Sequence, residues 1–384
     1  MDHSTALMGR ELFGSRHGHR IDFSLRSYIK RFVSREQDIY QIIMTQPQPL
    51  PVFASDYCHL ANNGNYIALA GEEGTIAIID TSKDNQWELV NGRAQWSAHD
   101  NSIFELKWSP NDHLIASVCG DQTTKIWDVE TQTEICSLIG HEFSVKSVSF
   151  NPRNPDVLVT ASRDGSVMVW DLRCAPMLPP DDADSTLVPA RRHRPVDVIA
   201  NAHSTEYHNS KSLKRRRAMS PGPAPKTQSI SVTSVVFLPH TFNTVASAGA
   251  ADGTIKLWDL RHHGYFSKRF SSLSIHPDGH KLFAACTDHR VYEFSAYTLG
   301  EPLFAYSAKT LKTSSFYVKT TVSPDGRFVA SGSMDGGVHI WELGRRECAP
   351  IVLRGHEKEV TSVSWSKRTL DQMIRRLEYG ASQA

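Results

Sequence analysis

Short runs of alternating apolar and polar residues recur along most of the chain. Residues 104–108, 114–119 and 124–127 are examples, and they are rich in β-branched and aromatic side chains. Alternation with a period of two predicts strands that are buried on one face only. Turn sequences separate the runs, such as Ser-Pro-Asn-Asp at 109–112 and Ser-Pro-Asp-Gly at 323–326. The pattern therefore predicts an all-β fold of short strands joined by tight turns.

A longer repeat organises these strands. In four segments an Asp stands six residues before a Trp: 121–128, 164–171, 252–259 and 335–342. The Trp is followed by Asp in the first three segments and by Glu in the fourth. Weaker copies place Ile79 and Tyr292 at the Trp position, and Gly-His pairs precede some repeats, as at 140–141. A period of about 40–45 residues with these features is typical of the WD-repeat β-propeller. Six repeats are visible and residues 353–365 open another, so we predict a seven-bladed propeller with an incomplete last blade.

A set of polar residues recurs from repeat to repeat. The second repeat contains His99, Ser117, Asp121 and Trp127, and the third contains His141, Thr160, Asp164 and Trp170. An active site is built once, whereas a repeated set indicates buried hydrogen bonds that tie loop to strand within each blade. The chain contains no nucleophile elbow, phosphate loop, zinc-protease or calcium-loop motif. We therefore predict a non-catalytic protein that needs no cofactor and no metal.

Composition narrows the kind of partner. Apolar residues make up 40% and charged residues 22%, close to a globular average. With 42 Lys and Arg against 41 Asp and Glu, the net charge is +1, so direct DNA binding is not expected. No apolar run reaches membrane-spanning length, and residues 1–27 lack the apolar core of a signal peptide. Six scattered cysteines without a Cys-x-x-Cys pair predict reduced, buried thiols of an intracellular protein.

An insertion follows the third repeat. The range of about 175–228 is rich in Pro, Asp and Arg and poor in apolar residues, which predicts a disordered basic and Pro-rich loop. Within it, Lys214, Arg215, Arg216 and Arg217 form a basic run. Such a run serves as a nuclear import signal, contacts a polyanion, or is only a solvated loop. Its place in a flexible loop favours import, and hence a nuclear location.

The propeller region, 51–366, has less regular ends. An N-terminal extension, 1–50, precedes it, and a short tail, 367–384, follows with apolar residues at helical spacing. Strand signals for the rest of the last blade are missing from the tail. Three explanations stay open: the ring is left incomplete, strands from 28–50 fill the gap (40–44 is the best candidate), or the chain is truncated.

Two strand ends extend the Trp-Asp pair to Trp-Asp-x-Arg: Trp170, Asp171 and Arg173 in one repeat, and Trp258, Asp259 and Arg261 in another. Further characteristic stretches are 96–99, 120–123, 163–174, 247–253 and 314–319, together with the basic loop after the third repeat. Through these residues the chain resembles, from about 53 to 365, the denticleless family of WD-repeat substrate receptors. It departs from that family in the unfinished last blade, a short connection after Arg261, and no long C-terminal tail.

The resemblance implies a role in ubiquitylation. Receptors of this kind dock on the adaptor DNA damage-binding protein 1, and through it on a cullin-4 RING ubiquitin ligase, by their Trp-Asp-x-Arg arginines. The resemblance thus implies adaptor binding by Arg173 and Arg261. It also implies recognition of sliding-clamp-bound replication-licensing and cell-cycle proteins, with the ubiquitin transfer performed by the ligase.

Substrate contacts are expected on the face built by the turns that hold the blade Asp residues. The residues there that the blade pattern does not explain are Lys146, Arg163, Phe316, Tyr317 and Lys319. Aromatic and basic groups together suit a partly acidic peptide, although Phe316 is equally well explained as an inward strand residue. The alternative function is a generic nuclear WD-repeat scaffold of the histone- or chromatin-assembly type. Adaptor binding that depends on Arg173 and Arg261 would separate the two.

Overall fold

The computed structural model describes residues 51–83, 94–177, 191–203, 231–239, 243–250, 255–260, 262–263, 272–297, 302–313, 318–345 and 349–366. All of them belong to one compact unit, 34–384, of the two into which the chain divides. Their regular structure is β-strand apart from one 3-10 turn, η3 (Ala61–Gly64). None of these residues forms a helix long and apolar enough to cross a membrane.

Three sheets form the first half of the described fold. Blade 1 contains β1 (Val52–Tyr57), β2 (Tyr66–Gly71), β3 (Thr75–Asp80) and β4 (Ala94–Ser97). Blade 2 contains β5 (Ile103–Trp108), β6 (Leu114–Cys119), β7 (Thr124–Asp128), β8 (Glu134–Leu138) and β12 (Arg191–His193). Blade 3 contains β9 (Val145–Phe150), β10 (Val157–Ser162), β11 (Val167–Asp171) and β13 (Asp197–Ile199).

Three more sheets complete the described strands. Blade 4 contains β14 (Val232–Phe237), β15 (Thr244–Gly249), β16 (Ile255–Asp259) and β17 (His262–His263). Blade 5 contains β18 (Ser272–Ile275), β19 (Lys281–Cys286), β20 (Arg290–Ser295) and β21 (Phe304–Ser307). Blade 6 contains β22 (Thr320–Val322), β23 (Phe328–Ser331), β24 (Gly337–Glu342) and β25 (Ile351–Arg354).

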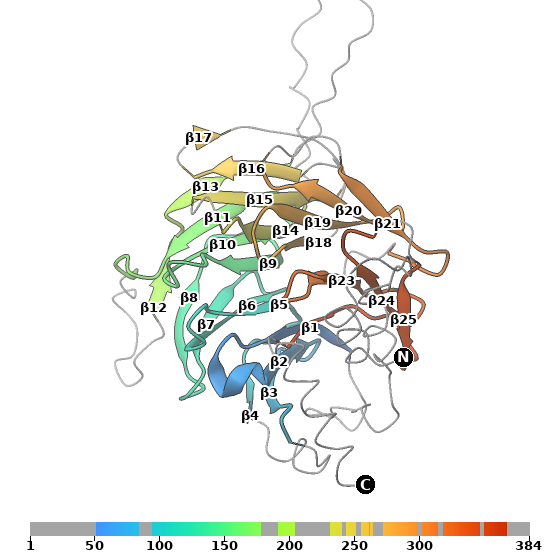
Figure 1. Cartoon of the computed structure of the whole chain (residues 1–384). Coiled ribbons are helices and arrows are strands. Elements are labelled where there is room, and N and C mark those ends of the chain that lie inside the picture. Colours follow the sequence, from blue (N-terminus) through green and yellow to red (C-terminus); the bar gives the residue numbers. More distant parts are fainter. Residues whose placement is uncertain are drawn as a thin grey trace, which may run out of the picture. The chain divides into compact units, whose positions relative to one another are not determined.

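The blades follow one another around a centre, as a WD-repeat propeller requires. The first strand of each blade lies innermost, and the last strand lies outermost (Figure 1). Successive inner strands contact each other from β1 through β5, β9, β14 and β18 to β22. The predicted seven blades are wrong for the described residues, which form six sheets. In these residues, the place between blade 6 and blade 1 holds only the segment 360–366, which forms no strand.

Segment 360–366 nevertheless joins the two ends of the ring. The backbone N–H of Lys319 donates to the carbonyl of Thr361 (2.9 Å), and the Thr361 hydroxyl donates to the carbonyl of Val52 (2.8 Å). On the blade 6 side, Gly332 permits the approach because a Cβ there would lie 2.2 Å from the carbonyl oxygen of Val360. The segment therefore occupies the position of a seventh inner strand.

Side-chain oxygens link each inner strand to the next. Ser147 and Ser149 of blade 3 accept the backbone N–H groups of Val235 and Phe237, at 3.1 and 3.2 Å. The same bonds join Asp56 to Trp108, Glu105 to Val148, Ser234 to Leu273, Ser272 to Thr320, Ser274 to Val322, Ser362 to Ser55 and Ser364 to Tyr57. We call this set the inner ladder. It satisfies N–H groups that no neighbouring strand of the same sheet reaches.

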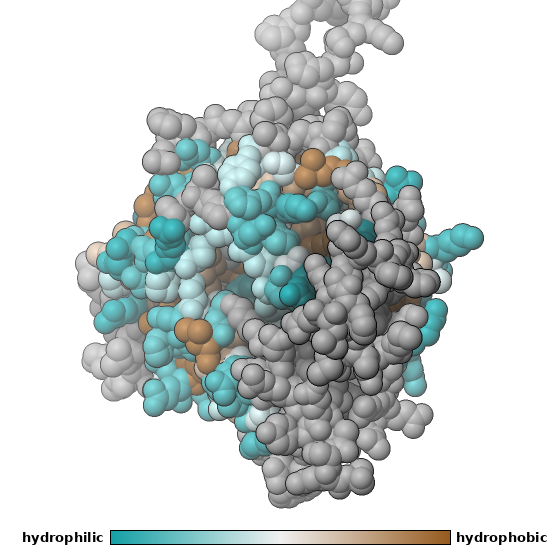
Figure 2. Space-filling model, in the orientation of Figure 1, coloured by the Kyte–Doolittle hydropathy of each residue, from teal (hydrophilic) through white to brown (hydrophobic). Residues whose placement is uncertain are grey.

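Apolar side chains fill the space between neighbouring blades. In each of blades 2, 3, 4 and 6 the Trp of the third strand packs against the blade before it. In blade 5 the structure corrects the predicted Trp-equivalent, Tyr292. Leu282 pairs with Phe294 as Leu158 pairs with Trp170, so Phe294 fills this place. The face drawn in Figure 2 is mainly hydrophilic, with separate apolar patches.

The repeated polar residues form a hydrogen-bonded chain within their blades. In blade 3, His141 bonds Asp164 through Nδ1 (2.8 Å) and Thr160 through Nε2 (2.7 Å), while the Trp170 indole donates to the same Thr160 hydroxyl (2.8 Å). Blade 2 repeats these contacts with His99, Asp121, Ser117 and Trp127. Blade 4 adds a set that the sequence reading had left incomplete, because Ser247 joins His203 to Trp258.

The insertion is shorter than predicted. Two strands lie inside the range 175–228 that was predicted to be a disordered loop. β12 pairs in parallel with β8 of blade 2, and β13 pairs with β11 of blade 3. Residues 191–199 therefore connect the outer edges of two neighbouring blades. The basic run Lys214, Arg215, Arg216 and Arg217, the extension 1–50 and the tail 367–384 lie outside the described residues.

Replacing Trp170 by Ala should lower the free energy of unfolding by about 3–5 kcal/mol, because a buried aromatic at a blade interface is lost. Trp170→Phe should cost about 1 kcal/mol, since it removes only the bond to Thr160 and a small part of the ring. Urea unfolding followed by circular dichroism measures both values. Leu60, whose surface is 75% exposed, supplies the control: Leu60→Ala should change stability by less than about 0.5 kcal/mol.

Ser362→Ala should lower the free energy of unfolding by about 1 kcal/mol, because the N–H of Ser55 loses its acceptor. Ser364→Ala should have a similar effect on the N–H of Tyr57. Ser97→Ala is the matched control, since Ser97 is exposed on the outer strand β4. Equal stability of all three variants in urea would show that segment 360–366 does not close the ring.

Candidate functional site

A cavity of about 390 Å³ lies at one end of the inner strands, and we call it the mouth. Its walls combine aromatic, basic and hydroxyl side chains from blades 1 to 4 and blade 6: Phe53, Phe104, Lys146, Arg163, Ser231, Thr233, Ala250 and Lys319. Phe53, Phe104, Lys146 and Thr233 belong to four successive inner strands, and Lys319 directly precedes a fifth, β22. The ring geometry therefore gathers residues that are far apart in the chain.

Three of the five predicted substrate-face residues line this cavity together. These are Lys146, Arg163 and Lys319, while Phe316 and Tyr317 lie outside the described residues. Two lining aromatics, Phe53 and Phe104, were missed. Both sit in alternating strand runs, where an aromatic residue is normally part of the core. These two phenylalanines differ from core aromatic residues only in lying near the start of an inner strand, β1 or β5.

The aromatic rings support the cations. Lys146 Nζ lies 3.2 Å from the centroid of the Phe104 ring, which is the geometry of a cation–π contact. Phe53 stacks on Phe104 with ring centroids 6.2 Å apart and planes inclined by 10°. The two rings form an apolar wall that holds the Lys146 ammonium at the cavity.

The mouth has a positive electrostatic environment. Burial lowers the pKa of Lys146, and repulsion by Arg163 and Lys319 lowers it further, to about 8. Lys319 is paired with Glu105 at 3.2 Å. Burial acts to raise the pKa of Glu105, but the charges of Lys319 and Lys107 and two hydrogen bonds outweigh it, so that the pKa is lowered. Glu105 is thus a charged carboxylate paired with Lys319.

The mouth leads into a channel of about 260 Å³ that the inner strands and segment 360–366 enclose. Phe53, Phe104 and Lys319 line both cavities. Inside the channel, Lys107 pairs with Asp56 at 3.0 Å. The mouth offers hydrogen-bond donors and an aromatic wall, and its described walls hold no nucleophile beside a general base. Its chemistry is that of binding an anionic or partly anionic group.

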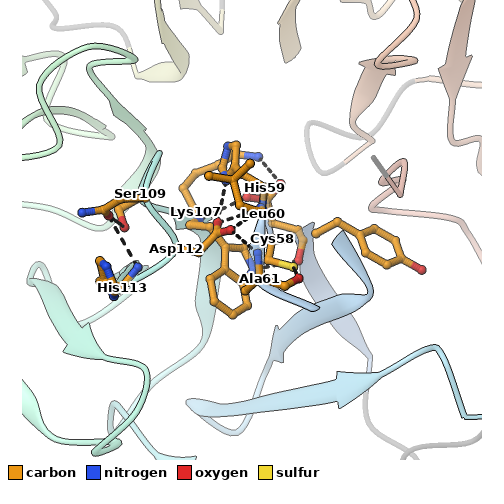
Figure 3. A network of polar contacts seen from close by, with 12 residues as sticks. Cys58, His59, Leu60, Ala61, Lys107, Ser109, Asp112 and His113 are labelled. Carbon is orange, nitrogen blue, oxygen red and sulfur yellow. Dashed lines mark hydrogen bonds and ion pairs between the residues drawn. The ribbon is translucent and has the colours of Figure 1, made fainter. Parts of the chain in front are cut away.

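The opposite ends of the inner strands carry a different network (Figure 3). The Asp112 carboxylate, in the turn after β5, accepts the backbone N–H groups of His59, Leu60 and Ala61 and lies 2.9 Å from His59 Nδ1. Burial would raise the pKa of Asp112, but these bonds outweigh it and lower the pKa. The network fixes the η3 loop of blade 1 to blade 2. Asp112 was read only as a turn residue in the sequence.

The first Trp-Asp-x-Arg motif lies at this second end. Trp170 is buried, whereas the Arg173 side chain is 60% exposed and forms a two-pronged pair with Asp171, at 2.9 and 2.6 Å. These bonds lower the pKa of Asp171. Arg163 precedes β11 and Arg173 follows it, so a strand of roughly 15 Å separates them. In the second motif, Trp258 is buried and Asp259 half-buried, and Arg261 lies outside the described residues.

One group of residues has the spacing of a metal site. His99, Cys119 and Asp121 bring ligand atoms within 4.8 Å of one another. Both ring nitrogens of His99 are engaged, by Asp121 and by Ser117, and burial raises the pKa of the Cys119 thiol to about 12. We assign His99 and Asp121 to the blade 2 hydrogen-bonded chain, because binding a metal would require them to break these hydrogen bonds.

Comparison with known proteins agrees with the fold. Residues 58–152 match the WD40 domain of anaphase-promoting complex subunit 4, and residues 224–259 and 306–342 match the WD domain, G-beta repeat. The denticleless protein homolog of Danio rerio is 34% identical over 370 residues, which cover 91% of this chain and 54% of that protein.

Two further relatives show the same coverage pattern. The denticleless protein homolog of Homo sapiens is 33% identical over 371 residues, covering 91% of this chain and 48% of the relative. Protein lethal(2)denticleless of Drosophila melanogaster is 31% identical over 340 residues, covering 83% and 42%. The chain thus spans about half the length of the curated relatives it matches.

The pKa of Lys146, measured by competitive labelling of its amine across pH, should lie near 8. Arg163→Gln should raise this pKa, because one of the two repelling charges is removed. Arg173→Gln, which removes a cation at the other end of β11, should leave it unchanged. A Lys146 pKa near the ordinary value of about 10.4 would contradict the described mouth.

Proposed function

Because this chain is a WD-repeat protein of the denticleless type, we propose that it acts as the substrate-recognition subunit of a cullin-4 RING ubiquitin ligase. The observation that carries the proposal is the separation of two exposed sites on blade 3. Arg163 belongs to the mouth at one end of β11, and Arg173 stands at the other end. Two separate ends would allow the protein to hold a substrate and an adaptor at once.

The proposed adaptor is DNA damage-binding protein 1, which would dock at the Arg173 end. Asp171 holds the guanidinium by two bonds while more than half of the Arg173 side chain stays exposed. A guanidinium oriented in this way can donate its remaining N–H groups to an acceptor on a partner. We assign Arg261 the same role by the identity of its motif.

The proposed substrates are sliding-clamp-bound replication-licensing and cell-cycle proteins, which would enter at the mouth. Ubiquitin transfer belongs to the ligase, and this chain contributes binding only. A nuclear location fits these substrates, with Lys214, Arg215, Arg216 and Arg217 as the import signal. The alternative function, a nuclear scaffold of the histone- or chromatin-assembly type, would use the same fold without dependence on Arg173.

Arg173→Glu should weaken binding to purified DNA damage-binding protein 1 by at least about tenfold, because the exposed guanidinium becomes a repelling carboxylate. Combination with Arg261→Glu should abolish binding. Biolayer interferometry with the full chain measures both, and unchanged thermal unfolding shows that the propeller stays folded.

Arg327→Glu is the matched control for this experiment. Arg327 also follows an Asp by two residues and is 53% exposed, but it lies in the turn before β23 of blade 6. Its replacement should not change adaptor affinity. If the Arg173 and Arg261 double variant binds the adaptor as the unchanged chain does, the ligase role is wrong and the scaffold role is favoured.

A further inference from the structure

We propose that the mouth binds an acidic segment of a partner protein, with Lys146, Arg163 and Lys319 as the carboxylate-reading residues. The inference rests on the proposed role of the mouth in substrate recognition. It adds the chemical class of the ligand, a peptide whose carboxylates enter a basic cavity lined on one side by aromatic rings.

The arrangement of charge supports an anionic ligand. Three cationic side chains from two blades line one cavity, and Lys319 pairs with the Glu105 carboxylate at 3.2 Å. The environment of Lys146 disfavours its positive charge because of burial and because Arg163 and Lys319 repel it. An incoming carboxylate would reverse this balance, since an opposite charge within about 4–6 Å favours the charged form of an ammonium.

Cavity size and wall chemistry restrict the ligand further. About 390 Å³ is near the lower end of ligand pockets, so the mouth accommodates one or a few side chains rather than a folded surface. Phe53 and Phe104 provide an apolar wall, whereas Ser231 and Thr233 provide hydroxyl groups. A short peptide that presents carboxylates beside an apolar group matches both walls.

Nucleic acid fits the mouth less well. The chain has a net charge of +1, so it lacks the extended positive field that a polyanion backbone requires. The three cations also converge on one cavity instead of following a groove. The observations therefore favour a peptide carboxylate, and an oligonucleotide serves as a competing probe in the test.

The test uses the full chain and three fluorescein-labelled peptides that differ only at their centre, which is Glu-Glu-Glu, Gln-Gln-Gln or a single phosphoserine. Fluorescence anisotropy at pH 7 and moderate salt should show binding of the glutamate peptide at least about tenfold tighter than the glutamine peptide. Arg163→Gln and Lys146→Met should each weaken the glutamate peptide by about tenfold, with unchanged thermal unfolding.

A pH series distinguishes a direct role of the Lys146 charge in peptide binding from a purely structural role of this side chain. The charges that act on Lys146 are those of Arg163 and Lys319, and Lys319 is paired with Glu105. Because the Lys146 pKa is about 8, its charge is lost as the pH rises through that value, and the affinity for the glutamate peptide should fall between pH 7 and pH 9. Lys146→Arg should retain the affinity at pH 7 and remove this pH dependence, since arginine stays charged.

Four outcomes would overturn the inference: equal affinity for the glutamate and glutamine peptides, no effect of Arg163→Gln, phosphoserine binding without glutamate binding, or a single-stranded oligonucleotide that binds the mouth more tightly than the glutamate peptide. Arg173→Glu distinguishes this result from the proposed ligase role. It should leave peptide affinity unchanged while adaptor binding is weakened, so either finding can fail without the other.

Discussion

The propeller depends on one requirement: the N–H groups at the inner edge of each sheet need acceptors, and the neighbouring blade supplies them. In each bond of the inner ladder the acceptor is a side-chain oxygen. It belongs to an acidic residue in blades 1 and 2 and to a Ser in the other positions. An unpaired buried N–H costs about 1–3 kcal/mol, so each bond fixes the spacing and register of two blades. Segment 360–366 takes part in the same way, which explains how six sheets complete a ring.

Glu105 connects this framework to the proposed binding site. One carboxylate oxygen accepts the N–H of Val148, and the other pairs with Lys319 at the mouth. The residue that holds blade 2 against blade 3 therefore also sets the position of a cation from blade 6. Burial of such a carboxylate is tolerated only because both oxygens are satisfied. The same side chain therefore links two blades and positions one cation of the mouth, Lys319.

The spacing of residues within each repeat made the blades predictable from the sequence. The closure of the ring and the lining of the mouth could be recognised only in the three-dimensional structure. The Asp-to-Trp spacing identified the His141, Thr160 and Asp164 set because those contacts recur within one repeat. Blade 5 was misaligned because Tyr292, like Phe294, is an aromatic residue in an alternating strand. β12 was not predicted, because its partner β8 is distant in the sequence and parallel pairing of this kind leaves no local sequence pattern. The Ser-x-Ser sequences in β9 and β18 were an available signal for the inner ladder. Their role becomes apparent only when the neighbouring blade is known.

The bonds from Ser362 to Ser55 and from Ser364 to Tyr57 join residues 307 positions apart. During synthesis on the ribosome, blade 1 emerges before the other blades and must wait until residues 360–366 have been made before its free side can be covered. Until then its apolar interface is open to other chains, and contacts of such long range form slowly. Folding of this protein in the cell therefore places blade 1 among the surfaces that chaperones must shield longest.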